Sequence, residues 1–212
     1  MFSLFLPKFS EMKKLFIAVL MLSAIACGNP YKKIIKTLDL QDGLYAEMIT
    51  SKGTIYIKLE PTLAPITTAN FVGLAEGTLE NNFRKLGEPY FDGLSFHRVV
   101  PNFVVQGGDP QGTGMGGPGY RFKTEVHADL KHDKAGTVAM ANSGPDTNGS
   151  QFYITHTATQ HLDGGYNVFG YVISGLEIVN DIQQGDLITK VNIIRVGKDA
   201  KDFDAVANFQ KL

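Results

Sequence analysis

A permanent cation, Arg98, lies inside a mostly apolar run of the chain. A buried arginine is costly unless it has a partner or a task. The aromatic residue Phe103 and the amide Gln106 follow closely. Together they offer a guanidinium, a flat apolar surface and an amide. This set suits a ligand with a carbonyl group beside a small apolar ring, and the structural alternative is an Arg98 held in an ion pair.

Two short strands are expected to carry these side chains. Valines occupy positions 99–100 and 104–105, and valine favours strands. Pro101-Asn102 between them is a turn signal. The sequence therefore predicts that Arg98, Phe103 and Gln106 lie close together around one hairpin.

A second segment, residues 140–154, carries further polar and aromatic groups. With the first, it resembles the cyclophilin family of peptidyl-prolyl isomerases. The matching motifs are Phe96-His97-Arg98, Gln106-Gly107-Gly108-Asp109, Met140-Ala141-Asn142, Thr147-Asn148-Gly149-Ser150-Gln151-Phe152, Leu162-Asp163-Gly164 and Val168-Phe169-Gly170. The resemblance covers residues 43–197. It implies an isomerase of Xaa-Pro bonds that needs no cofactor and acts on proline-containing polypeptides.

The resemblance also implies roles for individual residues. Arg98 matches the family's essential arginine, Phe103 should form the floor of a proline pocket, and Gln106 should bind substrate or orient Arg98. The remaining candidates for substrate binding are Val104, Ala141, Asn142, Gln151, Tyr153, His161, Leu162 and Tyr166. Ala141 leaves room for the residue before proline. Simple core packing is the alternative for Phe103, Tyr153 and Leu162.

Two positions depart from the commonest family pattern. His161 stands where many eukaryotic members have tryptophan, which implies weak cyclosporin binding. Tyr166 replaces a frequent histidine and should keep a pocket wall with a polar tip. Neither change affects Arg98.

Rotation about a prolyl peptide bond has a barrier of about 18–20 kcal/mol because the nitrogen lone pair is delocalised into the carbonyl. A catalyst must bind the twisted bond better than either planar form. Twisting makes the nitrogen a hydrogen-bond acceptor, so a fixed donor acts only in the transition state. Arg98 is the candidate donor, with no covalent chemistry.

The fold is predicted to be mainly β. The 23 glycines fall largely in loops between apolar runs, which favours an all-β barrel with many turns. The resemblance implies a closed eight-stranded antiparallel β-barrel capped by two α-helices. One helix should run from Pro65 to a C-cap at Gly77, with Thr68, Phe71, Leu74 and Ala75 on one face. The other should span 176–184.

The N-terminal residues predict export and lipidation. Lys13-Lys14 precedes the apolar segment 15–26, which fits a secretory signal. The segment ends in Ala-Ile-Ala before Cys27, the only cysteine, and resembles a bacterial lipobox. Cys27 would then carry a lipid anchor, and the alternative is an ordinary cleavage site. Met12 is a candidate start.

The domain boundaries follow from these assignments. We expect a lipoprotein signal at 1–27, a tether at 28–42, the isomerase domain at 43–197 and a C-terminal extension at 198–212. In the extension Phe203, Val206 and Phe209 recur at helical spacing, which predicts a short helix on the barrel or a helix that docks a partner. The protein should be a monomer in the bacterial envelope, on the periplasmic side of the outer membrane.

Other functional classes find little support in the sequence. The formal net charge is −1, so no basic excess indicates nucleic acid. The five histidines lack metal-binding motifs. Residues 112–117 match the dinucleotide-binding glycine pattern, but Pro118-Gly119 would stop the helix that it requires, so a loop is expected. A non-catalytic proline-peptide chaperone, or an accessory factor with one client, stays open as an alternative function.

Overall fold

The computed structural model describes residues 29–211, and the predicted signal and Cys27 lie outside them. The chain divides into two units between Asp39 and Leu40. In the first unit, helix α2 (Lys32–Thr37) occupies part of the segment that the sequence predicts to be a tether. None of the helices within 29–211 has the length and apolar character that a membrane crossing requires.

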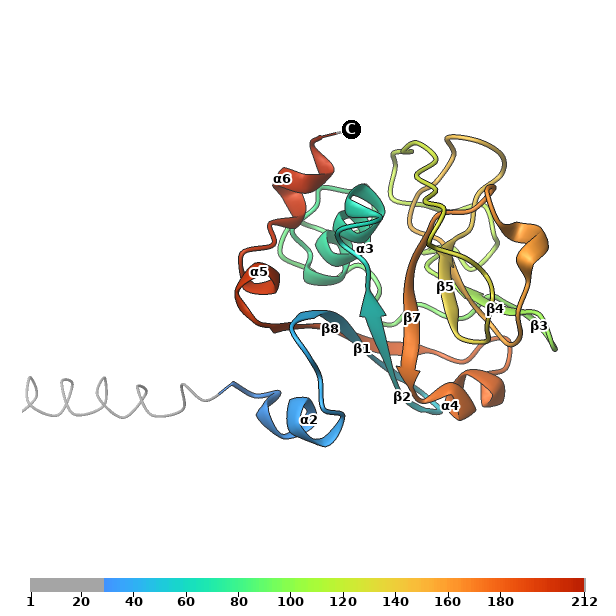
Figure 1. The fold of residues 1–212 in the computed structure, drawn as a ribbon. Coiled ribbons are helices and arrows are strands. Elements are labelled where there is room, and N and C mark those ends of the chain that lie inside the picture. The colour runs from blue at the N-terminus through green and yellow to red at the C-terminus, as the bar shows by residue number, and fades with distance from the viewer. Residues whose placement is uncertain (1–28, 212) are drawn as a thin grey trace, which may run out of the picture. The chain divides into compact units, whose positions relative to one another are not determined.

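The second unit is built on eight antiparallel strands, as predicted (Figure 1). The strands are β1 (Gly43–Thr50), β2 (Gly53–Leu59), β3 (Arg98–Val100), β4 (Val104–Gly107), β5 (Thr137–Met140), β6 (Phe152–Thr155), β7 (Val168–Ser174) and β8 (Ile188–Val196). Their order in the sheet is β3-β4-β6-β5-β7-β2-β1-β8. The Arg98 hairpin, β3–β4, therefore forms one edge.

The prediction of a closed barrel is wrong, because the sheet is a curled half-barrel. The edge strands β3 and β8 share no ladder, and the contacts on this side are the bridge between Ser95 and Leu187 and backbone hydrogen bonds between residues 93–96 and 185–188. The amide of Phe96 donates to the carbonyl of Asp186 at 2.8 Å beside this bridge. Strand β3 has three residues, begins after these contacts and pairs with β4, so the contacts with residues 185–188 do not extend along it.

Helix α3 (Pro65–Glu76) supplies aromatic packing to the core. The ring centroid of Phe71 lies 5.0 Å from that of Phe91, 5.7 Å from Phe152 and 5.2 Å from Phe169. The prediction that one face is buried understates the packing, because all nine residues from Thr67 to Ala75 are buried. Helix α6 (Ala205–Phe209) packs against α3 and covers a further side of it (Figure 1).

The predicted end of α3 at Gly77 is confirmed. Gly77 has a φ of 70°, and its amide donates to the carbonyl of Leu74 at 3.1 Å. A Cβ atom at Gly77 would lie 2.6 Å from the carbonyl oxygen of Glu88. Both the left-handed backbone and the close approach of this loop therefore require glycine.

The second predicted helix is shorter than expected. Helix α4 spans Leu176–Asp181 rather than 176–184, because Ile182 adopts an extended conformation with ψ of 133°. Val179 and Ile182 are buried, whereas Ile178 is half-buried. A short 3₁₀ helix, η1 (Gln160–Leu162), carries His161.

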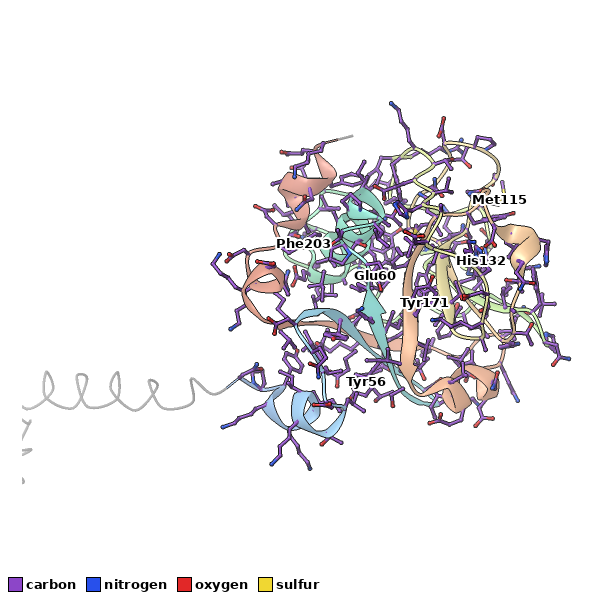
Figure 2. All side chains as sticks on the ribbon, viewed as in Figure 1. Tyr56, Glu60, Met115, His132, Tyr171 and Phe203 are labelled. Atoms are coloured by element: carbon purple, nitrogen blue, oxygen red, sulfur yellow. The ribbon has the colours of Figure 1, made fainter. Side chains whose placement is uncertain are left out.

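The C-terminal extension forms two short helices instead of one, α5 (Lys198–Lys201) and α6. The helical conformation is interrupted between them, and the side chain of Asp204 caps α6 by accepting from the amide of Ala207 at 3.0 Å. The apolar residues Phe203, Val206 and Phe209 pack against the core of the same unit. Figure 2 shows Phe203 beside these helices.

Candidate active site

Strand register places three of the predicted site residues in one row across the sheet. Arg98 lies opposite Gln106, and Gln106 lies opposite Tyr153. Directly opposed residues in antiparallel strands share a face. Val104, two residues before Gln106, shares this face as well. The neighbouring row faces the core, where Val105 and Ile154 are fully buried.

A chain of side-chain hydrogen bonds begins at Arg98. Its Nη1 donates to Oε1 of Gln106 at 3.2 Å, and Nε2 of Gln106 donates to Oε1 of Gln151 at 2.9 Å. Nε2 of Gln151 donates to the carbonyls of Gly114 at 3.0 Å and Gly116 at 2.9 Å. The amide of Gln151 is thus fully engaged within the protein, which fits a residue that positions Gln106 rather than one that binds substrate directly.

The guanidinium of Arg98 has donors to spare. Its side chain is exposed, and Gln106 is its hydrogen-bond partner. Arg98 forms no ion pair with another residue in the range 29–211. A guanidinium carries five N–H donors in a planar fork. Those not used by Gln106 are open to a bound ligand.

The glycine-rich segment that accepts from Gln151 is a loop, as predicted, and it is organised by Asp109. The carboxylate of Asp109 is buried and accepts from the amides of Gln111 at 2.7 Å, Thr113 at 2.9 Å and Gly114 at 2.5 Å. Burial raises the pKa of Asp109, but the backbone donors outweigh it and leave this pKa below its usual range. Asp109 is not among the residues that the sequence predicts for the site, although an acid directly before a glycine-rich segment was an available signal.

Two aromatic pairs stand beside this network. The rings of Phe103 and His161 stack with centroids 5.8 Å apart, and those of Tyr153 and Tyr166 meet edge to face at 5.8 Å. Phe103 and Tyr166 are half-buried, so neither belongs wholly to the core. Leu162 is half-buried beside them and packs against the core.

His132 contacts Tyr153 from the interior of the protein. The sequence did not predict this role for His132. Its Nε2 lies 2.9 Å from the hydroxyl oxygen of Tyr153, and its Nδ1 lies 2.8 Å from Oδ1 of Asp163. Because a carboxylate only accepts, Nδ1 carries the proton and Nε2 accepts from the tyrosine. His132 is fully buried, and this burial lowers its pKa despite the neighbouring carboxylate.

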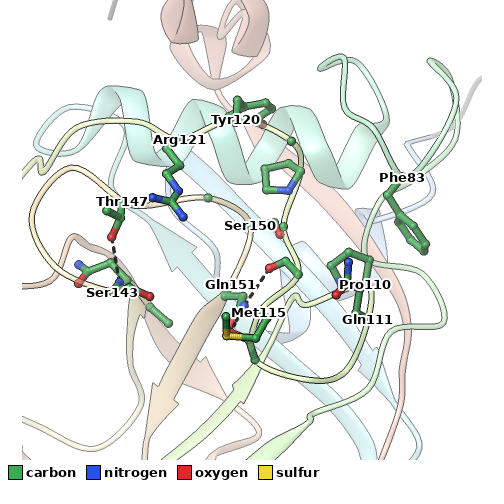
Figure 3. A pocket seen from close by; sticks show the side chains of 18 of the residues that line it. Phe83, Pro110, Gln111, Met115, Tyr120, Arg121, Ser143, Thr147, Ser150 and Gln151 are labelled. Carbon is green, nitrogen blue, oxygen red and sulfur yellow. Dashed lines mark hydrogen bonds between the residues drawn. The ribbon is translucent and has the colours of Figure 1, made fainter.

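A pocket of about 850 Å³ adjoins the network (Figure 3). It brings together four of the predicted residues, Gln106, Ala141, Asn142 and Gln151. Arg98, Phe103, Val104, Tyr153, His161, Leu162 and Tyr166 do not line it. The predicted site therefore has two parts, an aromatic face beside Arg98 and a pocket that begins at Ala141.

The rim of this pocket contains residues that no motif singled out. Met115 is 87% exposed on the glycine-rich loop, and Phe83 is 39% exposed on the loop before β3. Arg121 lines the opposite part of the pocket (Figure 3). Asn142 is held in place, because its Nδ2 donates to the carbonyl of Gly165 at 3.0 Å.

Comparisons with known proteins agree with the resemblance. The family model described as "Cyclophilin type peptidyl-prolyl cis-trans isomerase/CLD" matches residues 45–198. A Bacillus subtilis protein named peptidyl-prolyl cis-trans isomerase B is 45% identical over 139 residues, which cover 66% of this chain and 90% of the relative. A Helicobacter pylori peptidyl-prolyl cis-trans isomerase is 43% identical over 159 residues, covering 74% of this chain and 91% of the relative.

A solved structure shows the same fold. The Cryptosporidium parvum cyclophilin type peptidyl-prolyl cis-trans isomerase superimposes with a TM-score of 0.63 at 29% identity, covering 74% of this chain and all of its own. The same protein was also solved in the presence of the dipeptide Ala-Pro, with a TM-score of 0.59 and 30% identity to this chain. Together, the motifs, the fold and these relatives show that the chain belongs to the cyclophilin-type family of peptidyl-prolyl cis-trans isomerases.

Proposed function

We propose that this isomerase accelerates rotation about Xaa-Pro bonds by stabilising the twisted bond with Arg98. The observation that carries this proposal is the hydrogen-bond chain from Arg98 through Gln106 to Gln151. It holds one edge of the guanidinium and leaves other N–H groups exposed. A donor held in this way needs little reorganisation when the prolyl nitrogen becomes an acceptor.

The aromatic face supplies the binding energy for proline. In this proposal Phe103 forms the floor of the proline pocket, and its stack on His161 holds its ring in place. The walls are Val104, Tyr153, Leu162 and Tyr166. The residue before proline contacts Ala141, and Asn142 binds the substrate backbone. The Cryptosporidium relative solved with Ala-Pro supports a proline-containing peptide as the ligand.

The proposed rate effect comes from selective binding of the transition state. Contacts to the proline ring are similar in the cis and trans forms and therefore serve affinity. The bond from Arg98 to the prolyl nitrogen forms only when the bond is twisted, so it lowers the barrier. Each 1.36 kcal/mol of such stabilisation accelerates rotation about tenfold.

A non-catalytic chaperone or single-client factor that uses the same groove is the alternative. A pure binder needs the aromatic face but no arginine aimed at the bond. The engagement of Gln106 and Gln151 in holding Arg98 favours the enzyme. Lysine could not replace Arg98, because it lacks the planar fork of donors.

The cellular setting is also proposed, and it rests on the sequence alone. Cys27 in its lipobox would anchor the protein in the bacterial envelope, on the periplasmic side of the outer membrane. There it would assist the folding of envelope proteins as a monomer. His161 in place of tryptophan would leave cyclosporin binding weak.

The proposal is tested by measuring cis–trans exchange of an Ala-Pro-Phe peptide by NMR. The full chain and its Arg98→Ala variant are compared at equal concentration. We expect strong acceleration by the wild type and a loss of about tenfold or more in the variant. A folded wild type that binds the peptide without accelerating exchange would overturn the enzymatic proposal and favour the chaperone.

A further inference from the structure

Helix α6 of the C-terminal extension packs on two aromatic side chains that follow the glycine-rich loop in the chain. The ring centroid of Phe209 in α6 lies 5.3 Å from that of Tyr120 and 5.8 Å from that of Phe122. Phe122 is 3% exposed, so it is enclosed. The matched family model ends at residue 198, before α6 begins. These two rings are therefore held in part by a residue that lies outside the family domain.

Phe122 is joined to the segment before Gln151 by two reciprocal hydrogen bonds. The amide of Phe122 donates to the carbonyl of Asn148 at 2.9 Å, and Nδ2 of Asn148 donates to the carbonyl of Phe122 at 3.3 Å. Asn148 is fully buried. A change in the packing of the Phe122 ring should therefore be felt at Asn148, three residues before Gln151.

Tyr120 reaches the same segment through helix α3. Its hydroxyl donates to Oδ1 of Asn70 at 2.7 Å, and Nδ2 of Asn70 donates to the carbonyl of Gly149 at 2.8 Å. Figure 3 shows Tyr120 turned toward α3. The two rings that Phe209 contacts are thus connected to two successive residues of the chain, positions 148 and 149.

These two residues lead directly into the hydrogen-bond chain that holds Arg98. Ser150 comes next; it is buried, and its Oγ donates to the carbonyl of Gly108 at 2.7 Å. Gln151 follows, and it accepts from Gln106, the partner of Arg98. Closely packed segments transmit a displacement instead of absorbing it. A shift at residues 148–149 should therefore reach the backbone of Gln151.

We propose that Phe209 is a positioning residue for catalysis, which keeps Gln151 in the place where it supports Gln106 and Arg98. The proposal rests on the proposed function, in which Arg98 stabilises the twisted prolyl bond. The ring contacts of Phe209 are with Tyr120 and Phe122 and not with the aromatic face that binds proline. Its loss should therefore lower kcat, which depends on the transition state, and leave KM nearly unchanged.

The first experiment measures exchange of the Ala-Pro-Phe peptide by NMR with the full chain and its variants. Phe209→Ala should lower kcat about two- to fivefold, within the range for residues that act through a packed network. Phe209→Leu should restore most of the loss by refilling the space. If Phe209→Ala does not fold, Phe209→Val, which leaves a smaller cavity, takes its place in each comparison.

Phe203→Ala is the matched control. Phe203 lies in the same extension and packs against the same core. The ring contacts of residues 29–211 do not join it to Tyr120 or Phe122. This variant should keep the wild-type kcat, so an equal loss in both variants would assign the effect to general destabilisation and overturn the proposal.

A double variant tests the route through Gln151. In the Gln151→Ala background, Phe209→Ala should lower kcat no further, because the residue through which Phe209 acts is already gone. Effects that simply add would show that Phe209 acts by another route, which overturns the proposal.

The side-chain amide of Gln151 gives a readout that does not depend on turnover. Its Nε2 donates to the carbonyls of Gly114 and Gly116, so the NMR shifts of its two protons report on these bonds. Phe209→Ala should shift these signals, and Phe203→Ala should leave them unchanged.

The two readouts separate the positioning role from the proposed function. A folded Phe209→Ala variant with the wild-type kcat and unchanged Gln151 signals overturns the positioning role. If the wild type accelerates no exchange, yet Phe209→Ala still shifts the Gln151 signals, Phe209 does position Gln151 and the proposed isomerase function fails.

Discussion

Nε2 of Gln106 donates to Oε1 of Gln151 at 2.9 Å. This bond connects the exposed Arg98, which donates to Gln106, with Gln151, which is bonded to the glycine-rich loop. Beyond Gln151 lie the carbonyls of Gly114 and Gly116, and Gly114 also donates its amide to Asp109. The position of the guanidinium therefore depends on groups with which Arg98 itself makes no hydrogen bond.

Replacing Gln151 by alanine should lower kcat more than it raises KM. The change removes the acceptor for Gln106 and frees two carbonyls, so Arg98 loses the support of its partner. We expect kcat to fall about tenfold, equivalent to 1.36 kcal/mol of transition-state stabilisation. NMR exchange measures it, with the exposed Gln184→Ala as the control. An unchanged kcat would show that Gln106 alone positions Arg98.

Tyr153→Phe should cost stability while sparing activity. The substitution removes the hydroxyl that lies 2.9 Å from His132 and leaves a buried nitrogen unpaired. An unsatisfied buried group costs about 1–3 kcal/mol. The ring against Tyr166 remains, so kcat/KM should change less than about twofold, or 0.4 kcal/mol. Urea unfolding and exchange kinetics measure the two effects; equal stability would show that the bond contributes nothing.

Stability should decline as the pH falls below the unperturbed pKa of histidine. Burial lowers the pKa of His132, so the unfolded chain takes up its proton at a higher pH than the folded protein. The unfolding free energy is therefore intact above about pH 6.5 and falls below it, by up to about 1.4 kcal/mol per pH unit for one proton.

A substitution at His132 tests whether this histidine causes the loss of unfolding free energy at low pH. His132→Gln should flatten the decline between pH 7.5 and 5.5 in urea unfolding. Some slope should remain, because burial also lowers the pKa of His97. A slope identical to that of the wild type would assign the whole dependence to other groups.

Gly77 and Gly87 both have a positive φ angle, so they provide a matched test of close packing. At position 77 the backbone φ is 70°, and the Cβ atom of an alanine would lie 2.6 Å from the carbonyl oxygen of Glu88. At Gly87 φ is 91°, but a Cβ atom there would have open space around it. A left-handed backbone at a non-glycine residue costs about 1–3 kcal/mol. Gly77→Ala should exceed Gly87→Ala in the loss of unfolding free energy. Equal losses would mean that backbone strain alone matters at Gly77.

The sequence by itself determined the family and the candidate residues, and the resemblance to that family implied eight strands. These depend on local features: motifs of fixed spacing, the valines around Arg98, and a proline and a glycine at the two ends of α3. Such features restrict backbone angles over a few residues, so they can be recognised without knowing what packs where. The hairpin that carries Arg98 and Gln106 was predictable for this reason.

Only the tertiary structure decided how distant segments meet. The gap between β3 and β8 depends on the length of an edge ladder, which no local pattern reports. The amide of Gln151 is engaged by a loop 37 residues away, and His132 contacts Asp163 from 31 residues away. Phe209 reaches Tyr120 from the far end of the chain. Partners at such separations are chosen by packing and register, which exist only once the chain has folded.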